Sequence, residues 1–274
     1  MPNLKMISMR LKSVTNIQKI TMSMKMVSAA KYARAERDLK VARPLGIAAQ
    51  HFYSQAEVGC QKEVPKELYV TISSDRGLAG GVHSNISKAI RNEMLEKTSE
   101  QQANTRIICV GDKSRAFMAR YFPAQTILVG SEIGRLPPTM GDAAAVASAV
   151  ITCGYEFDQG KMMFNYYKSV VSYDTQAIQL FSLESVLAAE KMSAYDSVDA
   201  DVLQSYMEFS LASLVYYAMK EGATSEQSSR MTAMDNSTKN AGEMMDKLRI
   251  TFNRTRQAVI TGELIEIISG AAAL

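Results

Sequence analysis

The apolar residues at the beginning of the chain recur at steps of three and four, which places them on one face of an α-helix. They are Leu4, Ile7, Leu11 and Val14, followed on a neighbouring stripe by Ile17, Ile20, Met24 and Val27. We predict one long helix from about Leu4 to Val58. Pro44 should kink or locally break this helix, because proline lacks a backbone donor and its ring clashes with the preceding turn.

The C-terminal part of the chain predicts a second long helix, because no proline occurs from about Ala200 to Ala273. Its last two-thirds carries an uninterrupted heptad repeat, the pattern of a coiled-coil seam. The seam positions are Met231, Met234, Thr238, Ala241, Met245, Leu248, Phe252, Thr255, Val259 and Gly262. A helix of roughly 70 residues would be ~105 Å long, which exceeds the width of a small domain. We therefore expect the two terminal helices to pair antiparallel and to project from the rest of the chain.

The middle of the chain changes to an alternation of short strands and helices. The predicted strands are 68–73, 106–110, 125–129, 161–171 and 175–181, and the predicted helices are 84–97 and 142–155. Such alternation favours a parallel, Rossmann-like α/β sheet, and the short connection at 172–174 adds an antiparallel hairpin at its edge. The predicted fold is α/β, with a globular body at 66–190 between shaft helices at 1–60 and 199–274.

The last residues of the chain form an apolar tip. Leu264–Leu274 is apolar on most sides, and Glu266 is its only charged residue. An exposed surface this apolar marks a protein contact. We expect the tip to lie inside another protein.

The net charge of +3 conceals an asymmetry, because residues 1–43 carry a charge of +8 and the remainder −5. A basic arm attracts nucleic acid, anionic membrane or an acidic protein surface, and charge alone does not choose among them. No apolar stretch of about 18 residues exists, so we expect no membrane span. Cys60, Cys109 and Cys153 have neither metal-ligand nor redox spacing.

Residues for catalysis are scarce. The two histidines, His51 and His83, have no second ligand at metal spacing. Ser73–Gly81 is a glycine-rich turn between a predicted strand and helix, the position at which phosphates bind in α/β proteins. It lacks the P-loop lysine and the dinucleotide glycine spacing. A structural turn is therefore favoured, and a phosphate site stays the alternative.

Polar residues of an unusual kind cover parts of the C-terminal helix, at 224–230 and 253–257. They are mainly Ser, Thr, Asn and Arg, and the first three form helices less readily than Glu and Lys but hydrogen-bond well. A merely solvated face is one interpretation. We favour specific polar contacts with a surrounding protein.

Stretches at both ends of the chain, and the turn between them, resemble the ATP synthase gamma subunit family. The stretches are Arg10–Thr21 with Met24–Val27, Ser74–Leu78, and Ser225–Asn236 with Asn253–Ala271. The resemblance covers essentially the whole chain and is closest to mitochondrial, animal-like members. Ala79 departs from the family, which usually has cysteine there.

The resemblance implies a non-catalytic central rotor shaft on the matrix side of the mitochondrial inner membrane, peripheral to it. Its implied partners are three alpha and three beta subunits, small stalk subunits of the delta and epsilon type, and the membrane rotor ring, with no nucleic acid. It implies no cofactor on this chain, because ATP, ADP and Mg²⁺ belong to the partner subunits. The asymmetric shaft would meet each catalytic subunit with a different face, so that rotation couples proton flow to ATP synthesis.

The resemblance also implies roles for individual residues. The residues that would contact the catalytic subunits are Met24, Lys25, Arg230, Arg256 and Gln257. The residues that would lie in the apolar bearing at the top of the shaft are Ile265, Ile268 and Leu274. Contact with the rotor ring is expected near Tyr195–Gln204.

Two different classes of protein remain as alternatives. One is a small-molecule or phosphate-binding α/β domain with a helical dimerisation arm, which would use the turn at Gly77–Gly81. The other is a basic coiled-coil nucleic-acid binder, although the basic helix has Tyr32 as its only aromatic residue before Phe52. Neither alternative explains two long helices at opposite ends of the chain.

Overall fold

The computed structural model describes residues 4–59, 65–189, 191–192, 195 and 199–272. Contacts between residues group the chain into two units. The first, termed the coil unit, comprises Met1–Ser28 and Met231–Leu274, and the second, termed the body, comprises Ala29–Arg230. The predicted division at 1–60, 66–190 and 199–274 followed the elements, whereas the contacts divide both long helices.

A five-stranded sheet forms the centre of the body, in the order β3-β2-β1-β4-β5. The strands are β1 (Glu67–Ile72), β2 (Thr105–Val110), β3 (Thr126–Gly130), β4 (Gln159–Ser169) and β5 (Ser172–Phe181). The first four are parallel, and β4 and β5 pair antiparallel as a hairpin, as predicted. The α/β class and the position of each strand are thus confirmed, with boundaries shifted by at most three residues.

Successive residues of β1 point to opposite faces of the sheet and into two separate cores. Leu68, Val70 and Ile72 belong to the larger core, which includes the hairpin. Tyr69, between them, is fully buried in the smaller core. A strand that is buried on both faces reads as a continuous apolar run, as LYVTI does.

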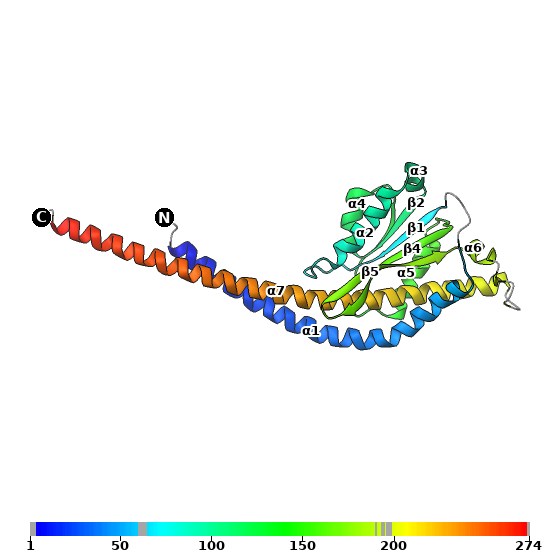
Figure 1. Ribbon diagram of the computed structural model, residues 1–274, viewed down its shortest axis with the longest axis horizontal. Coiled ribbons are helices and arrows are strands. Elements are labelled where there is room, and N and C mark those ends of the chain that lie inside the picture. The colour runs from blue at the N-terminus through cyan, green and yellow to red at the C-terminus, as the bar shows by residue number, and fades with distance from the viewer. Residues whose placement is uncertain (1–3, 60–64, 190, 193–194, 196–198, 273–274) are drawn as a thin grey trace. The chain divides into compact units, whose positions relative to one another are not determined.

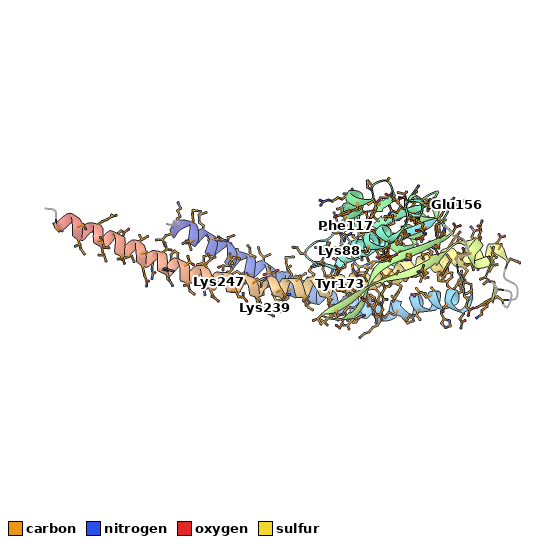
Figure 2. All side chains as sticks on the ribbon, turned by 45° about the horizontal axis from the view of Figure 1, so that its top comes forward. Lys88, Phe117, Glu156, Tyr173, Lys239 and Lys247 are labelled. Atoms are coloured by element: carbon orange, nitrogen blue, oxygen red, sulfur yellow. The ribbon has the colours of Figure 1, made fainter. Side chains whose placement is uncertain are left out.

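Helices cover both faces of the sheet (Figure 1). The helices between the strands are α2 (Val82–Glu96), α3 (Ser99–Ala103), α4 (Asp112–Tyr121) and α5 (Met140–Thr152), and α6 (Leu183–Leu187) follows the hairpin. Lys88 of α2 and Phe117 of α4 lie on the same side of the body (Figure 2), and both helices pack into the smaller core. The larger core receives α5 and parts of the two long helices.

The N-terminal helix α1 (Leu4–Gln55) is continuous through Pro44, so the predicted break is wrong. Pro44 and Lys40 are both exposed. The Lys40 carbonyl has no helical donor, because proline lacks an N–H, and water can reach it instead.

The C-terminal helix α7 (Ala200–Ala272) has 73 residues, which gives a length of about 110 Å at 1.5 Å per residue. In the coil unit it pairs with α1 around a small core of Val14, Ala241 and Met245. The predicted pairing of the two terminal helices is confirmed. Among the described residues, no helix is long and apolar enough to cross a membrane.

Candidate functional site

The coil unit is held together by polar contacts as well as by its seam. The Lys25 ammonium lies 2.6 Å from Asp235 Oδ1, and Lys239 lies 2.9 Å from Oδ2 of the same carboxylate. One turn further along, the hydroxyls of Thr21 and Thr238 are 2.8 Å apart. Hydrogen bonds from Lys25 and then Lys239 hold the pKa of Asp235 below its usual range. Lys25, a predicted contact residue, is thus already paired within its own chain.

The middle of the predicted seam faces α1, where Ala241, Met245 and Leu248 pack against Leu11 and Val14. Met234, Ala241 and Met245 are buried, and the seam residues that are half-buried are Met231, Thr238, Leu248, Phe252, Thr255, Val259 and Gly262. The core of the pair is small, because the seam alternates large residues with Ala and Thr. A thin pair of this kind leaves most of its outer surface open to other proteins.

The far part of α7 exposes the residues predicted for contact and for the bearing. Arg256 and Gln257 are exposed, and no described residue bonds to either of them. Ile265 and Ile268 are 58% and 65% exposed. Leu274 lies outside the described residues. This apolar and cationic surface is therefore accessible to another molecule. Its contact with a catalytic subunit and with the apolar bearing stays a prediction.

Met24 and Arg230, also predicted to contact a catalytic subunit, lie in different surroundings. Met24 is half-buried in the coil unit. Arg230 is only 6% exposed. Its guanidinium pairs with Glu226 and donates to the Gly77 carbonyl oxygen at 3.2–3.3 Å. These intrachain bonds give Arg230 a structural role in the body, and its contact with another subunit stays untested.

A row of serine hydroxyls on α7 donates to backbone carbonyls of β4, of the hairpin turn after it and of the loop after β1. Ser225 Oγ bonds to the Asn165 carbonyl at 3.1 Å, and Ser229 Oγ bonds to the Ala79 carbonyl at 2.7 Å. Ser228 donates to the Val170 carbonyl. The stretch 224–230, expected to contact a surrounding protein, is therefore largely satisfied within the body. We call these three serines with Arg230 the polar row.

An ion pair missed by the sequence analysis ties α1 to α7 and β4. Glu221 is fully buried and accepts from Arg43 Nε at 2.6 Å and from the Tyr167 backbone N–H at 2.9 Å. Arg43 also donates to the Tyr167 carbonyl at 2.7 Å, and its hydrogen bond to Glu221 raises its pKa. The available signal was the charged pair Lys220-Glu221 directly after the mainly apolar run Leu211–Met219.

The glycine-rich turn is occupied by structural contacts. Asp75 Oδ1 accepts from the Asp112 backbone N–H at 2.7 Å, which fills the positive N-terminal end of α4. The carbonyls of Gly77 and Ala79 accept from the polar row. Leu78 adopts a positive φ of 61°. The structural interpretation of this turn agrees with these contacts.

The two histidines differ in environment. His51 is exposed on α1. His83 is half-buried at the beginning of α2, with Nε2 3.3 Å from Ser74 Oγ, and burial lowers its pKa. Among the described residues no three His, Cys, Asp or Glu side chains form a group that could hold a metal ion.

Comparison with known proteins gives matches over the full length of the chain. The sequence profile of the family described as ATP synthase matches residues 3–274. The mitochondrial ATP synthase subunit gamma of Drosophila melanogaster is 60% identical over 275 residues, covering 100% of this chain and 91% of that protein. The mitochondrial ATP synthase F(1) complex subunit gamma of Rattus norvegicus is 53% identical over 271 residues, covering 99% of each.

Solved structures give the same result. A chain from the central stalk and c-ring of the Tetrahymena thermophila mitochondrial ATP synthase matches with a TM-score of 0.67 and 29% identity, over 79% of this chain and 98% of that chain. A chain from the Euglena gracilis mitochondrial ATP synthase, with OSCP, F1 and c-ring, matches with a TM-score of 0.82 over 98% of this chain and 94% of that chain. Its 21% identity makes that second likeness one of fold.

Proposed function

Because the chain belongs to the ATP synthase gamma subunit family, we propose that it is the central rotor shaft that couples rotation of a membrane ring to the catalytic subunits. The observation that carries this proposal is the full-length match, which includes both halves of the coil unit. The relatives share the whole chain, and thus the paired terminal helices as well as the body.

The proposed mechanism depends on an asymmetric surface. The coil unit has two different helices, and α7 continues past the part that is packed on α1. A single asymmetric shaft inside three equivalent catalytic subunits presents a different surface to each. A contact that is stronger in one state of a catalytic subunit than in another shifts the population of those states. Rotation would therefore take each catalytic site through binding, synthesis and release in turn.

We assign these contacts to three polar residues of the coil unit. Arg256 and Gln257 are exposed and unpaired among the described residues, and a guanidinium binds carboxylates bidentately. Lys25 can participate because its side chain is 44% exposed, although it is paired with Asp235. The basic N-terminal arm favours an acidic inner surface of the partners over nucleic acid or membrane.

We further propose that the chain performs no chemistry itself. The polar residues at 224–230 make bonds within the body, and the carbonyls of the glycine turn accept from Ser229 and Arg230. ATP, ADP and Mg²⁺ would then bind to the alpha and beta subunits. The names of the relatives place the chain in mitochondria, where it would lie on the matrix side of the inner membrane with the delta- and epsilon-type stalk subunits and the rotor ring.

The subunit composition of the native complex tests this function. Native mass spectrometry of the complex that co-purifies with this chain should show one copy beside three alpha and three beta subunits. A lone chain, or a homo-oligomer that carries nucleotide, would contradict the proposal and favour the small-molecule alternative.

A further inference from the structure

Three different groups of one sheet residue, Tyr167 of β4, are bonded to the two long helices. Its backbone N–H donates to Glu221 Oε2 of α7 at 2.9 Å, and its carbonyl accepts from Arg43 Nη2 of α1 at 2.7 Å. Its hydroxyl lies 2.5 Å from the hydroxyl of Tyr32, also on α1. Tyr167 is only 9% exposed. A single buried residue of the sheet therefore holds both helices.

The bond between Arg43 and Glu221 closes these contacts into a ring. Arg43 Nε donates to Glu221 Oε1 at 2.6 Å, while Nη2 of the same guanidinium reaches the Tyr167 carbonyl. A guanidinium can make both bonds because its donors are fixed in one plane, whereas an ammonium is a single point of charge. The Tyr166 ring lies against this plane, with its centroid 4.8 Å from Arg43 Cζ.

The two α1 side chains that reach Tyr167 lie on one face of the helix. Tyr32 and Arg43 are eleven positions apart, which is about three turns of helix and roughly 16 Å along its axis. They hold Tyr167 from its two ends, the hydroxyl and the carbonyl. Two bonds on one stripe, separated along the axis, resist both rotation and tilt of α1 relative to the strand.

These bonds restrain rotation in a way that apolar packing does not. Apolar burial is non-directional, so it depends little on the angle at which a helix lies against its neighbour. A hydrogen bond weakens steeply when its angle is distorted. Two of the partner groups are backbone atoms of β4, which cannot change rotamer and which the sheet holds between β1 and β5.

We propose that Tyr167, Arg43, Glu221 and Tyr32 form a torque anchor, the point at which torque passes between the body and the two long helices. The torque anchor prevents α1 and α7 from turning about their own axes relative to the sheet. Both helices continue into the coil unit, so rotation lost at the anchor would not reach the catalytic subunits. This inference rests on the proposed function, because torque acts on the chain only if it is a rotor.

The torsional stiffness of the assembled complex tests the anchor. With the catalytic subunits fixed to a surface and a probe on the membrane rotor ring, the variance of the probe angle in the stalled enzyme measures this stiffness. Arg43→Met should widen the variance, because α1 loses its bonds to β4 and to Glu221. Arg43→Lys keeps the charge but cannot make both bonds, so its variance should lie between those of Arg43→Met and the wild type.

Lys161→Met is the matched control. Lys161 is also on β4, and its side chain is 31% exposed in its ion pair with Glu93, as that of Arg43 is in its pair with Glu221. Glu93 lies on α2 rather than on a long helix. Lys161→Met should therefore lower the free energy of unfolding to a similar extent and leave the variance of the probe angle unchanged. Equal widening in Lys161→Met and Arg43→Met would indicate a general loosening of the body and overturn the proposal.

Tyr32→Phe tests the other contact and decides the result if Arg43→Met does not fold. It removes one hydroxyl and leaves the ring of Arg43, Glu221 and Tyr167 intact, so it should widen the variance less than Arg43→Met does. A complex that assembles but has wild-type variance in both variants would overturn the anchor and leave the proposed function standing. A wild-type chain that joins no complex with catalytic subunits would instead overturn the proposed function, and the anchor with it.

Discussion

Gly46 lies in α1 at a position that has no room for a side chain. A β-carbon there would come within 2.2 Å of Cγ of Tyr217. Gly46→Ala should therefore destabilise the body by about 1–3 kcal/mol through overpacking, although glycine to alanine in a helix normally stabilises by up to about 1 kcal/mol. The midpoint of denaturant unfolding, followed by tyrosine fluorescence, measures the change.

Gly262 is the matched control, because it is also helical and a β-carbon there meets nothing within 4 Å. Gly262→Ala should leave the body unchanged and slightly raise the stability of α7. If Gly46→Ala behaved in the same way, the close approach of Tyr217 would be wrong.

The Asp235 carboxylate offers a pH test of the coil unit. Because Lys25 and Lys239 lower its folded pKa, the pair adds stability above the unfolded pKa of about 3.9, and that stability is lost as the pH falls through the folded value. Carboxyl NMR titration should show that Lys25→Met raises the pKa of Asp235 toward its ordinary value. Lys239→Met should have the smaller effect, and an unchanged pKa in Lys25→Met would exclude the 2.6 Å contact.

We expect a substitution at Arg256 to impair function without affecting folding. Arg256 is exposed and has no bond from a described residue, so Arg256→Glu should change the free energy of unfolding by no more than about 0.5 kcal/mol. In the assembled enzyme it should reduce proton-driven ATP synthesis severalfold, because a carboxylate would repel an acidic partner loop.

Lys247→Glu is the control for charge reversal on the same helix, and Figure 2 shows its position on α7. Equal losses in both variants would indicate a general effect of charge. Normal synthesis rates in Arg256→Glu would remove Arg256 from the coupling contacts.

At the scale of elements, Glu221 of α7 joins three elements of the body. It accepts from Arg43 of α1 and from the Tyr167 backbone N–H of β4. Glu221→Ala should destabilise the body by about 3 kcal/mol, because it leaves Arg43 unpaired in a partly buried position. The double variant Arg43→Met with Glu221→Ala should lose less than the sum of the single variants, which denaturant unfolding would measure as a coupling energy. Strict additivity would mean that the ion pair contributes nothing.

Helices with a strong pattern were predictable, and those with a weak one were not. Helix α2 has an apolar stripe that includes Ile86, Ile90 and Met94, so its spacing was visible in the sequence. Helix α4 was missed because it has ten residues and only Met118 and Ser114 are buried. So short an apolar stripe is not recognisable among its charged residues. The helix also begins after Gly111, whose φ is 107°, and no side-chain cap marks this position in the sequence.

The function of a polar residue in a helix was harder to predict than its presence. The serines of the polar row stood out as poor helix formers, but a hydroxyl satisfies a carbonyl of its own chain as readily as one of a neighbour. Whether a serine bonds to its own chain or to a neighbour depends on where β4 and the turn after β1 lie. Both are distant from α7 in sequence. The periodicity of α7 therefore predicted the seam positions but not the bonds of Ser225 and Ser229.

At the scale of the whole molecule, both long helices take part in two units. Helix α7 gives residues 200–230 to the body and the rest to the coil unit, and α1 divides at Ser28. The continuous periodic pattern predicted the helices, but it did not indicate that α1 divides after Ser28 and α7 after Arg230. A boundary inside a helix leaves no Pro, Gly or linker signal in the sequence, because the backbone hydrogen bonds continue through it.

The coil unit pairs the first part of the chain with the last, as in the contact between Thr15 and Met245, which are 230 positions apart. A ribosome releases residues 4–28 first and residues 231–272 last. All the residues of the body emerge between them, so the body can form before the coil unit has its second helix. Until translation ends, the apolar stripe that includes Val14 has no partner. We therefore expect this stripe to stay exposed, and open to contacts with other molecules, until the residues of α7 that cover it have been made.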